Sequence, residues 1–225
     1  MKKWMRFFLL PLFALVLSAC GDSDSDTYFT VTIQNVSNTS NLFSPFAPGV
    51  WAVHSEDNLL FTEEQTATSG LELLAEDGDP SVSVTELQND DKVIQFEQLS
   101  QAAITPGASY SFTFKADPGN YLSFATMFVK SNDLFFAPPQ EGLALFTEGT
   151  PLTGDMTAKI RIWDAGTEDN QVPGNGDQQP LGGTISGGTS DPTPLGVRDR
   201  ATFNDGHALP EVEDLIKVTI SVEYR

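Results

Sequence analysis

Alternation of apolar and polar side chains is the feature that most limits how this chain can fold. Near its start, Phe29, Val31 and Ile33 alternate with polar residues. A period of two places successive side chains on opposite faces of an extended strand, so that one face is buried and the other meets water. The same pattern returns in the ranges 109–115 and 217–225. The sequence therefore predicts half-buried strands in antiparallel sheets.

Four more ranges are predicted to be strands. The range 121–129 is apolar on both faces, which is typical of a central strand covered on both sides. Shorter strands are predicted over 50–54, 93–96 and 157–164. In the last of these, the period of two places Asp164 at the strand end, on the same face as the buried isoleucines.

Helical periodicity is confined to two short ranges, 69–76 and 80–89. Asp79 is a suitable N-cap for the second helix, and Pro80 is a suitable first helical residue. Many short strands, little helix and no alternation of strands with helices predict an all-β fold. We expect an antiparallel β-sandwich with two short helices over one end.

The N-terminal segment, residues 1–19, is not expected to belong to the fold. A basic start, an apolar run and small residues precede Cys20, which is the layout of an export signal. The residues around Cys20 resemble the lipobox of bacterial lipoproteins, in which cleavage leaves the cysteine as a lipid-modified N-terminus. The apolar run is too short to span a bilayer. We expect a lipoprotein signal peptide over 1–19, an acidic tether over 20–27 and one domain over 28–225.

The charge of the remaining chain limits its partners. Without residues 1–19, nine basic residues stand against 31 acidic ones. Because such a surface repels phosphate backbones, no nucleic acid partner is expected. Membrane attachment is expected through lipidated Cys20, since the acidic surface itself would not adhere to anionic lipid. Gly21 resembles sorting signals that favour the outer membrane over the inner membrane of the cell envelope.

Cysteine and motif content argue against several kinds of site. Cys20 is the only cysteine, so the domain has no disulfide and no thiolate metal site. The sequence contains no Gly-x-Ser-x-Gly, no His-Glu-x-x-His and no glycine-rich phosphate loop after a strand. The two histidines, His54 and His207, are expected to be structural or solvated. A non-enzymatic protein is predicted, although a glycan hydrolase that uses a carboxylate pair stays open as the alternative.

Three acidic side chains are expected to converge at one rim of the sandwich. Asp164 ends a predicted strand, and a glycine-containing turn can bring Glu168 back towards it. Asp133 follows the predicted central strand by four residues. A cluster of oxygen ligands without cysteine or histidine fits a hard cation, and calcium tolerates irregular loops better than magnesium does. The alternative, that these are solvated loop residues, stays open at this point.

The range 165–215 lacks predicted elements and is rich in glycine and proline. Unstructured connections of this length are uncommon inside compact domains and usually indicate function or disorder. We interpret the range as a mobile excursion, and a binding loop stays open as the alternative.

Several motifs, in order along the chain, resemble the spondin N-terminal domain family. They lie in the ranges 70–80, 116–119, 122–133 and 163–168. The resemblance implies an extracellular β-sandwich similar to the C2 fold that acts in adhesion. It also implies calcium bound by Asp133, Asp164 and Glu168, where Glu168 stands at a position that is often Asp in animal members. Its partner would be an extracellular protein or a glycan.

We therefore expect a calcium-binding, non-enzymatic binding or adhesion module, anchored in the cell envelope as a lipoprotein. The alternative is an envelope glycan hydrolase. A third possibility is a purely structural acidic sandwich, which would bind neither metal nor ligand.

Overall fold

The computed structural model describes residues 26–56, 58–181 and 195–225. The predicted signal peptide, Cys20 and nearly all of the acidic tether therefore lie outside the described residues. The strands are β1 (Thr27–Asn35), β2 (Val50–His54), β3 (Val93–Gln98), β4 (Ser109–Lys115), β5 (Tyr121–Met127), β6 (Leu134–Ala137), β7 (Leu143–Ala144), β8 (Phe146–Thr147), β9 (Thr150–Pro151), β10 (Gly154–Asp155), β11 (Arg161–Asp164), β12 (Arg198–Asp199) and β13 (Ile216–Tyr224). The helices are α1 (Ser69–Asp77) and α2 (Ser81–Asn89), with 3-10 helices η1 (Ser37–Thr39), η2 (Thr157–Lys159), η3 (Arg200–Thr202) and η4 (Val212–Asp214).

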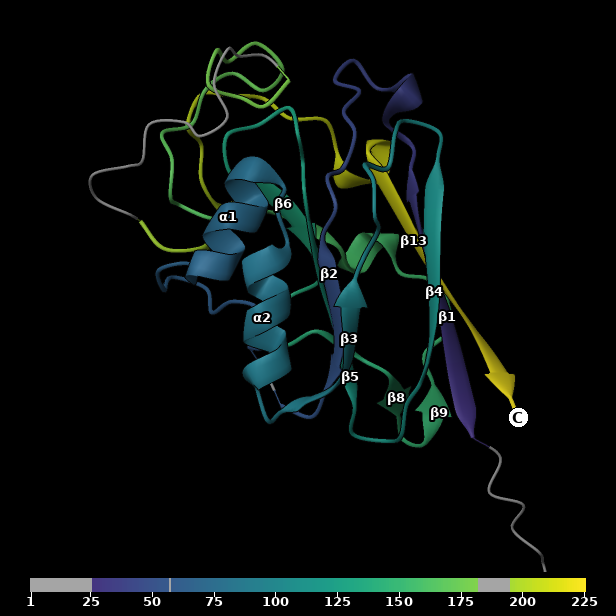
Figure 1. Ribbon diagram of the computed structural model, residues 1–225. Coiled ribbons are helices and arrows are strands. Elements are labelled where there is room, and N and C mark those ends of the chain that lie inside the picture. Colours follow the sequence, from purple (N-terminus) through teal and green to yellow (C-terminus); the bar gives the residue numbers. More distant parts are fainter. Residues whose placement is uncertain (1–25, 57, 182–194) are drawn as a thin grey trace, which may run out of the picture.

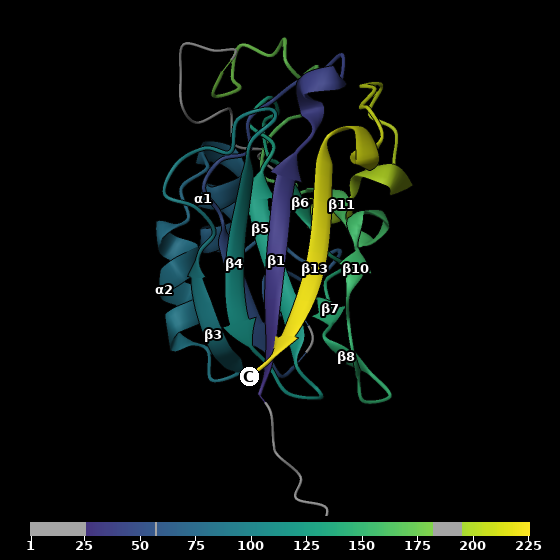
Figure 2. The ribbon, with the colours of Figure 1, turned by 90° about the vertical axis from the view of Figure 1, so that its right-hand side faces the viewer.

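Two antiparallel sheets stack against each other, as predicted. The smaller sheet has the strand order β10-β13-β1-β4, and the larger has the order β12-β11-β6-β5-β2-β3, with β7 paired to β5. Figure 1 shows the sheets side by side, with both α-helices on the outer side of the larger sheet. Figure 2 shows the smaller sheet face on. The fold is thus mostly β, with two short helices in a third layer.

The alternating strands supply one face each to the core between the sheets. Along β1, Phe29, Val31 and Ile33 are fully buried, and the residues between them are partly exposed. Trp51 of the larger sheet stacks on Phe112 of the smaller one, with ring centroids 4.6 Å apart. Burial of these aliphatic and aromatic side chains between the sheets is the main favourable contribution to folding.

The larger sheet is buried on both faces. All residues of β2 and β6, and all of β5 except Tyr121, are buried. On the outer face, helix α1 packs over β5 and β6, and α2 packs over β2 and β3. A second apolar core, which includes Leu71, Leu74 and Trp163, fills the space between this face and the helices. The doubly apolar range 121–129 correctly predicted a central strand.

Two local predictions were wrong in detail. Only the end of the range 157–164 is a strand, because η2 occupies Thr157–Lys159. There the Thr157 hydroxyl accepts a hydrogen bond from the backbone of Val218 at 3.1 Å, which favours a turn over an extended chain. Helix α2 has Pro80 at its N-cap, and Asp79 instead accepts a hydrogen bond from the backbone N–H of Ser81 at 2.9 Å.

The described parts of the range 165–215 pack against the sandwich. Strand β12 pairs with β11, with Asp199 opposite Trp163 and Arg198 opposite Asp164. Val197 and Gln179 are fully buried. The segment predicted as a mobile excursion therefore supplies an edge strand to the larger sheet, and its residues 182–194 lie outside the described residues.

The two ends of the described domain lie together, opposite the acidic loops. The backbones of Asp26 and Arg225 exchange hydrogen bonds of 2.8 and 3.0 Å. Figures 1 and 2 show β1 beginning and β13 ending at the bottom, whereas Figure 1 shows the green loop over 165–181 at the top. Over the described ranges, no helix has the length and apolar character needed to cross a membrane.

A matched pair of substitutions tests this assignment of the core. Ile33 is fully buried between the sheets, and Ile94 of β3 is 50% exposed. We expect Ile33→Ala to lower the free energy of unfolding by about 2–5 kcal/mol. Ile94→Ala is expected to change it by less than about 0.5 kcal/mol. Chemical denaturation of both variants measures the difference, and equal effects would contradict the assignment.

Candidate functional site

The pairing of β6 with β11 brings the predicted acidic residues together. Asp164, the last residue of β11, lies opposite Leu134, the first residue of β6. Asp133 therefore adjoins the turn that follows β11, and its carbonyl accepts a hydrogen bond from the backbone of Ala165 at 3.2 Å. All three predicted site residues, Asp133, Asp164 and Glu168, are brought to one end of the larger sheet.

Asp133 is a fully buried carboxylate bound by the turn after β11. Its Oδ2 accepts hydrogen bonds from the backbone N–H groups of Thr167 and Glu168 at 2.9 and 3.2 Å. The Thr167 hydroxyl lies 3.4 Å from the same oxygen. Its other oxygen, Oδ1, is buried and has no hydrogen-bond partner among the described residues. A buried acceptor without a partner is unfavourable, so it requires an explanation.

Asp164 is also fully buried, but both of its oxygens are occupied. Oδ1 accepts a hydrogen bond from the backbone of Gly166 at 2.8 Å, and Oδ2 accepts one from the Asn170 amide at 2.6 Å. Gly166 has φ of +69°, and a Cβ there would lie 2.5 Å from the carbonyl oxygen of Gly196. The turn can therefore close over the carboxylate only with glycine at this position.

Burial and like charges act together on the cluster. Glu168 is 5% exposed, so three acidic side chains share a region with little access to water. Burial, followed by repulsion from Asp164, raises the pKa of Asp133 to about 7, against the lowering effect of the backbone hydrogen bonds from Thr167 and Glu168. Glu76 of α1 extends the acidic region towards Thr167, and burial raises its pKa as well.

Arg198 is the cation of this region, and sequence reasoning did not identify it. One guanidinium nitrogen lies 3.6 Å from Asp164 Oδ1, a long contact for an ion pair. The guanidinium also lies over the ring of Phe203, 4.1 Å from its centroid. Its Nε is buried without a hydrogen-bond partner within the described chain. One arginine beside three carboxylates leaves the region with excess negative charge.

Amide side chains form an outer layer that sequence reasoning also missed. Asn132 is 1% exposed, and its Oδ1 accepts a hydrogen bond from the backbone of Gln171 at 3.1 Å. The Gln179 amide, fully buried, lies 3.4 Å from the same oxygen. Asn132 directly precedes Asp133, so the polar run 131–133 was the available signal for Asn132, whereas no local pattern marks Gln179. These bonds pack the loop over 171–179 against the segment between β5 and β6.

The residue types in this region are suited to a hard cation, but their arrangement is less suited to one. Asp133 Oδ1 lacks a hydrogen-bond partner among the described residues, and the carboxylates of Asp164 and Glu168 beside Asp133 are donors of the kind that calcium prefers. Across the described ranges, however, no three His, Cys, Asp or Glu side chains are arranged to hold one ion together. The reason is visible at Asp164, whose oxygens face Gly166, Asn170 and Arg198.

The geometry does not support carbohydrate cleavage by these acids. A glycosidase must place its two carboxyl groups on either side of a sugar bond. Asp133 and Asp164 have no exposed surface, so a polysaccharide cannot reach them. The histidines do not add a reactive group, because His54 is buried with Nε2 2.9 Å from the Ser123 hydroxyl, and His207 lies in the turn closed by Asp205.

The raised pKa of Asp133 predicts how stability without metal depends on pH. The folded state holds this proton up to about pH 7, whereas the unfolded chain releases it near 3.8. Because the folded chain binds more protons between these values, stability falls as pH rises through this window. Asp133→Asn should remove this contribution. Thermal unfolding in chelator, from about pH 4 to pH 8, tests it; parallel profiles of the two proteins would contradict the assigned pKa.

A family comparison agrees with the motifs found in the sequence. The model of the Spondin_N family matches residues 38–175, more than half of the chain, including β5, β6, β11 and the turn with Glu168. No curated protein matches this chain. Domains of this family are typically extracellular modules for binding or adhesion, and they are generally not catalytic. The chain therefore belongs to the Spondin_N family.

Proposed function

We propose that this protein is a calcium-stabilised, non-enzymatic binding module, presented outside the cytoplasm and anchored as a lipoprotein. The observation that carries the calcium site is the buried Asp133 Oδ1, which has no partner in the described structure although it adjoins Asp164 and Glu168. A calcium ion bound at Asp133, with the side chains of Asp164 and Glu168 reoriented to share it, would supply the positive charge that Arg198 alone does not provide.

The chain fixes one of the three proposed ligands, Asp133, before any ion binds. The backbone N–H groups of Thr167 and Glu168 fix one oxygen of Asp133, which leaves the other available. Asp164 would exchange its long contact with Arg198 for the ion, since 3.6 Å is weaker than a close ion pair. Asn132 joins this region to the loop over 171–179. Neutralising the carboxylates would therefore stabilise that loop.

The surface near these loops supports a binding role. Large apolar side chains are exposed on the segments at this end of the sandwich: Phe43, Val172, Leu181 and Leu195. Lys130 lies over the Phe43 ring, 4.0 Å from its centroid, and its carbonyl accepts a hydrogen bond from Gly174 at 2.9 Å. Exposed apolar groups beside polar loops are typical of surfaces that contact partners. The proposed partner is an extracellular protein or a glycan.

The lipid anchor is proposed from the sequence around Cys20. The described domain begins at the end opposite the acidic loops, as Figures 1 and 2 show. A tether that starts there would place the proposed binding surface away from the membrane. The Gly21 signal supports the outer membrane as the location.

Thermal unfolding with calcium and with chelator tests the ion site. At a hundredfold excess of free calcium over its dissociation constant, binding contributes about 2.7 kcal/mol. We therefore expect the melting temperature to rise by roughly 5–10 °C. Asp133→Asn and Asp164→Ala should abolish this rise. Asp117→Asn, in the exposed turn between β4 and β5, is the matched control and should keep it. An unchanged melting temperature in the wild-type protein would reject the site.

Cell fractionation tests the anchor separately. Wild-type protein should be recovered with membranes and labelled by a clickable fatty acid, because two or more acyl chains hold a protein stably on a bilayer. Cys20→Ser should prevent both labelling and membrane recovery. Ser18→Ala keeps the cysteine and serves as the control. Label on the Cys20→Ser variant would rule out Cys20 as the modified residue.

A further inference from the structure

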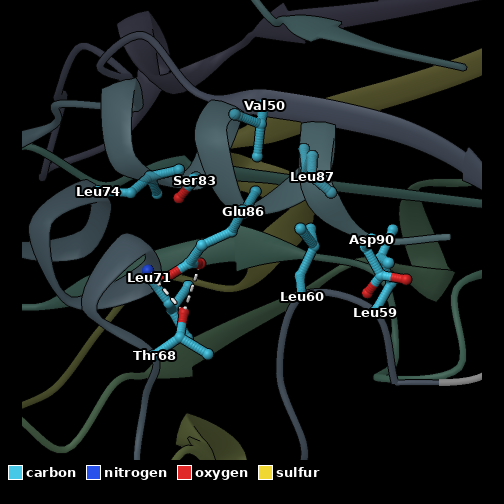
Figure 3. Close-up of a pocket in the computed structure, with 11 residues that line it drawn as sticks. Val50, Leu59, Leu60, Thr68, Leu71, Leu74, Ser83, Glu86, Leu87 and Asp90 are labelled. Atoms are coloured by element: carbon cyan, nitrogen blue, oxygen red, sulfur yellow. Dashed lines mark hydrogen bonds between the residues drawn. The ribbon is translucent and has the colours of Figure 1, made fainter. Parts of the chain in front are cut away.

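A pocket separate from the acidic loops lies between the two helices and the larger sheet. It has a volume of about 330 Å³, within the range of small-molecule sites. Its walls are mostly apolar and come from β2, β5, both helices and the segment before α1. Leu59, Leu60, Leu71, Leu74 and Leu87 supply most of this surface. Figure 3 shows Leu60, Leu71 and Leu87 around the side chain of Glu86.

The polar groups of the pocket are acidic or neutral. Ser83, Glu86 and Leu87 follow one another at spacings of three and one residues, which places them on one face of α2, and Asp90 directly follows the helix. Of the described residues that line the pocket, none is basic, and neither acid forms a salt bridge there. Lys92, the nearest base in the sequence, pairs with Glu56 at 3.2 Å. The pocket is therefore negatively charged.

Glu86 is held in place before any ligand binds. Its carboxylate accepts hydrogen bonds from the Thr68 hydroxyl at 2.9 Å and from the Gly70 backbone at 3.0 Å, and Figure 3 shows the contact with Thr68. The helices approach closely here, because a Cβ on Gly70 would lie 2.3 Å from a Glu86 oxygen. A fixed carboxylate loses little side-chain entropy when it binds a cation.

Ser83 supplies an independent indication of a ligand. Its side chain lines the pocket and is 4% exposed, and its hydroxyl forms no hydrogen bond with any described residue. A serine within a helix often donates its hydroxyl to the carbonyl four residues earlier, but Ser83 does not form this bond. The Ser83 hydroxyl oxygen is not one of the atoms shut off from water without a partner, so it is open to the pocket, where a ligand group can take the place of water.

We propose that this pocket binds a small organic cation, a primary ammonium group on a compact apolar body. The apolar body contacts the leucines, while the ammonium group lies beside the Glu86 carboxylate, and Asp90 adds negative charge at the other end of the pocket. An ammonium group carries three N–H donors, so it satisfies acceptors that an apolar ligand would leave unpaired. Ser83 accepts one of these hydrogen bonds. The site is distinct from the calcium region, and it does not depend on calcium binding.

Titration of the full chain with cyclohexylammonium chloride, followed by backbone NMR, tests the proposal. We expect saturable shifts of Leu60, Ser83 and Ala125, which line the pocket. Cyclohexanol, which has the same shape but no charge, should bind to the wild-type protein at least about threefold more weakly than the cation does. The variants Glu86→Gln and Asp90→Asn should bind the cation more weakly than the wild-type protein by a similar factor. Asp77→Asn, an exposed acid at the end of α1, removes the same charge elsewhere and should leave affinity within about twofold.

Ser83→Ala separates binding from folding. It should weaken binding of the cation but leave the melting temperature equal or higher, because alanine removes the unpaired hydroxyl and favours helix. The proposal would be overturned if cyclohexanol bound as tightly as the cation, or if Asp77→Asn weakened binding as much as Glu86→Gln and Asp90→Asn do. A titration without saturable shifts would overturn it as well. So would Ser83→Ala with unchanged affinity, since the hydroxyl would then take no part in binding.

Discussion

Burial of the larger sheet on both faces is the constraint on which the rest of the structure depends. Strands β2, β5 and β6 face the smaller sheet on one side and the helices on the other, so they have no face on which polar side chains can reach water. Strands β2, β5 and β6 accordingly contain no charged residue, and the polar side chains within β5, Ser123 and Thr126, are hydrogen-bonded. Asp133 and Asp164 lie at strand ends, where the turn after β11 supplies backbone N–H groups in place of water. The acidic region is thus a result of the layered architecture.

The sequence predicted the strands well where one face meets water. Alternation predicted the bounds of β1 and β4 nearly to the residue, because burial of one face requires apolar side chains at every second position. The alternation rule failed over the first half of 157–164. The spacing of the buried Ile160 and Ile162 matched a strand, but η2 occupies the residues before them. Asp164 was nevertheless placed correctly at the strand end, since the last four residues do form β11.

The remaining parts of both sites depend on contacts between distant segments. Arg198 reaches Asp164 only because β12 pairs with β11, and a two-residue strand leaves no periodic signal. The pocket combines Leu59 and Leu60 with one face of α2, and no spacing in the sequence relates these segments. The polar residues Ser83 and Glu86 were visible on that face, but a solvated helix would show the same pattern. Local patterns identify strands and acids, whereas counter-ions and cavities follow from tertiary packing.

The hydrogen bonds between Asp26 and Arg225 have a mechanical consequence for a tethered protein. Strand β1 is paired along its length with β13 on one side and with β4 on the other. A load applied between residue 26 and the loops at the opposite end acts along this strand, perpendicular to its hydrogen bonds. Separation then requires many bonds to shear at once, instead of opening one after another. A domain pulled in this direction resists force through β1, one of its two longest described strands.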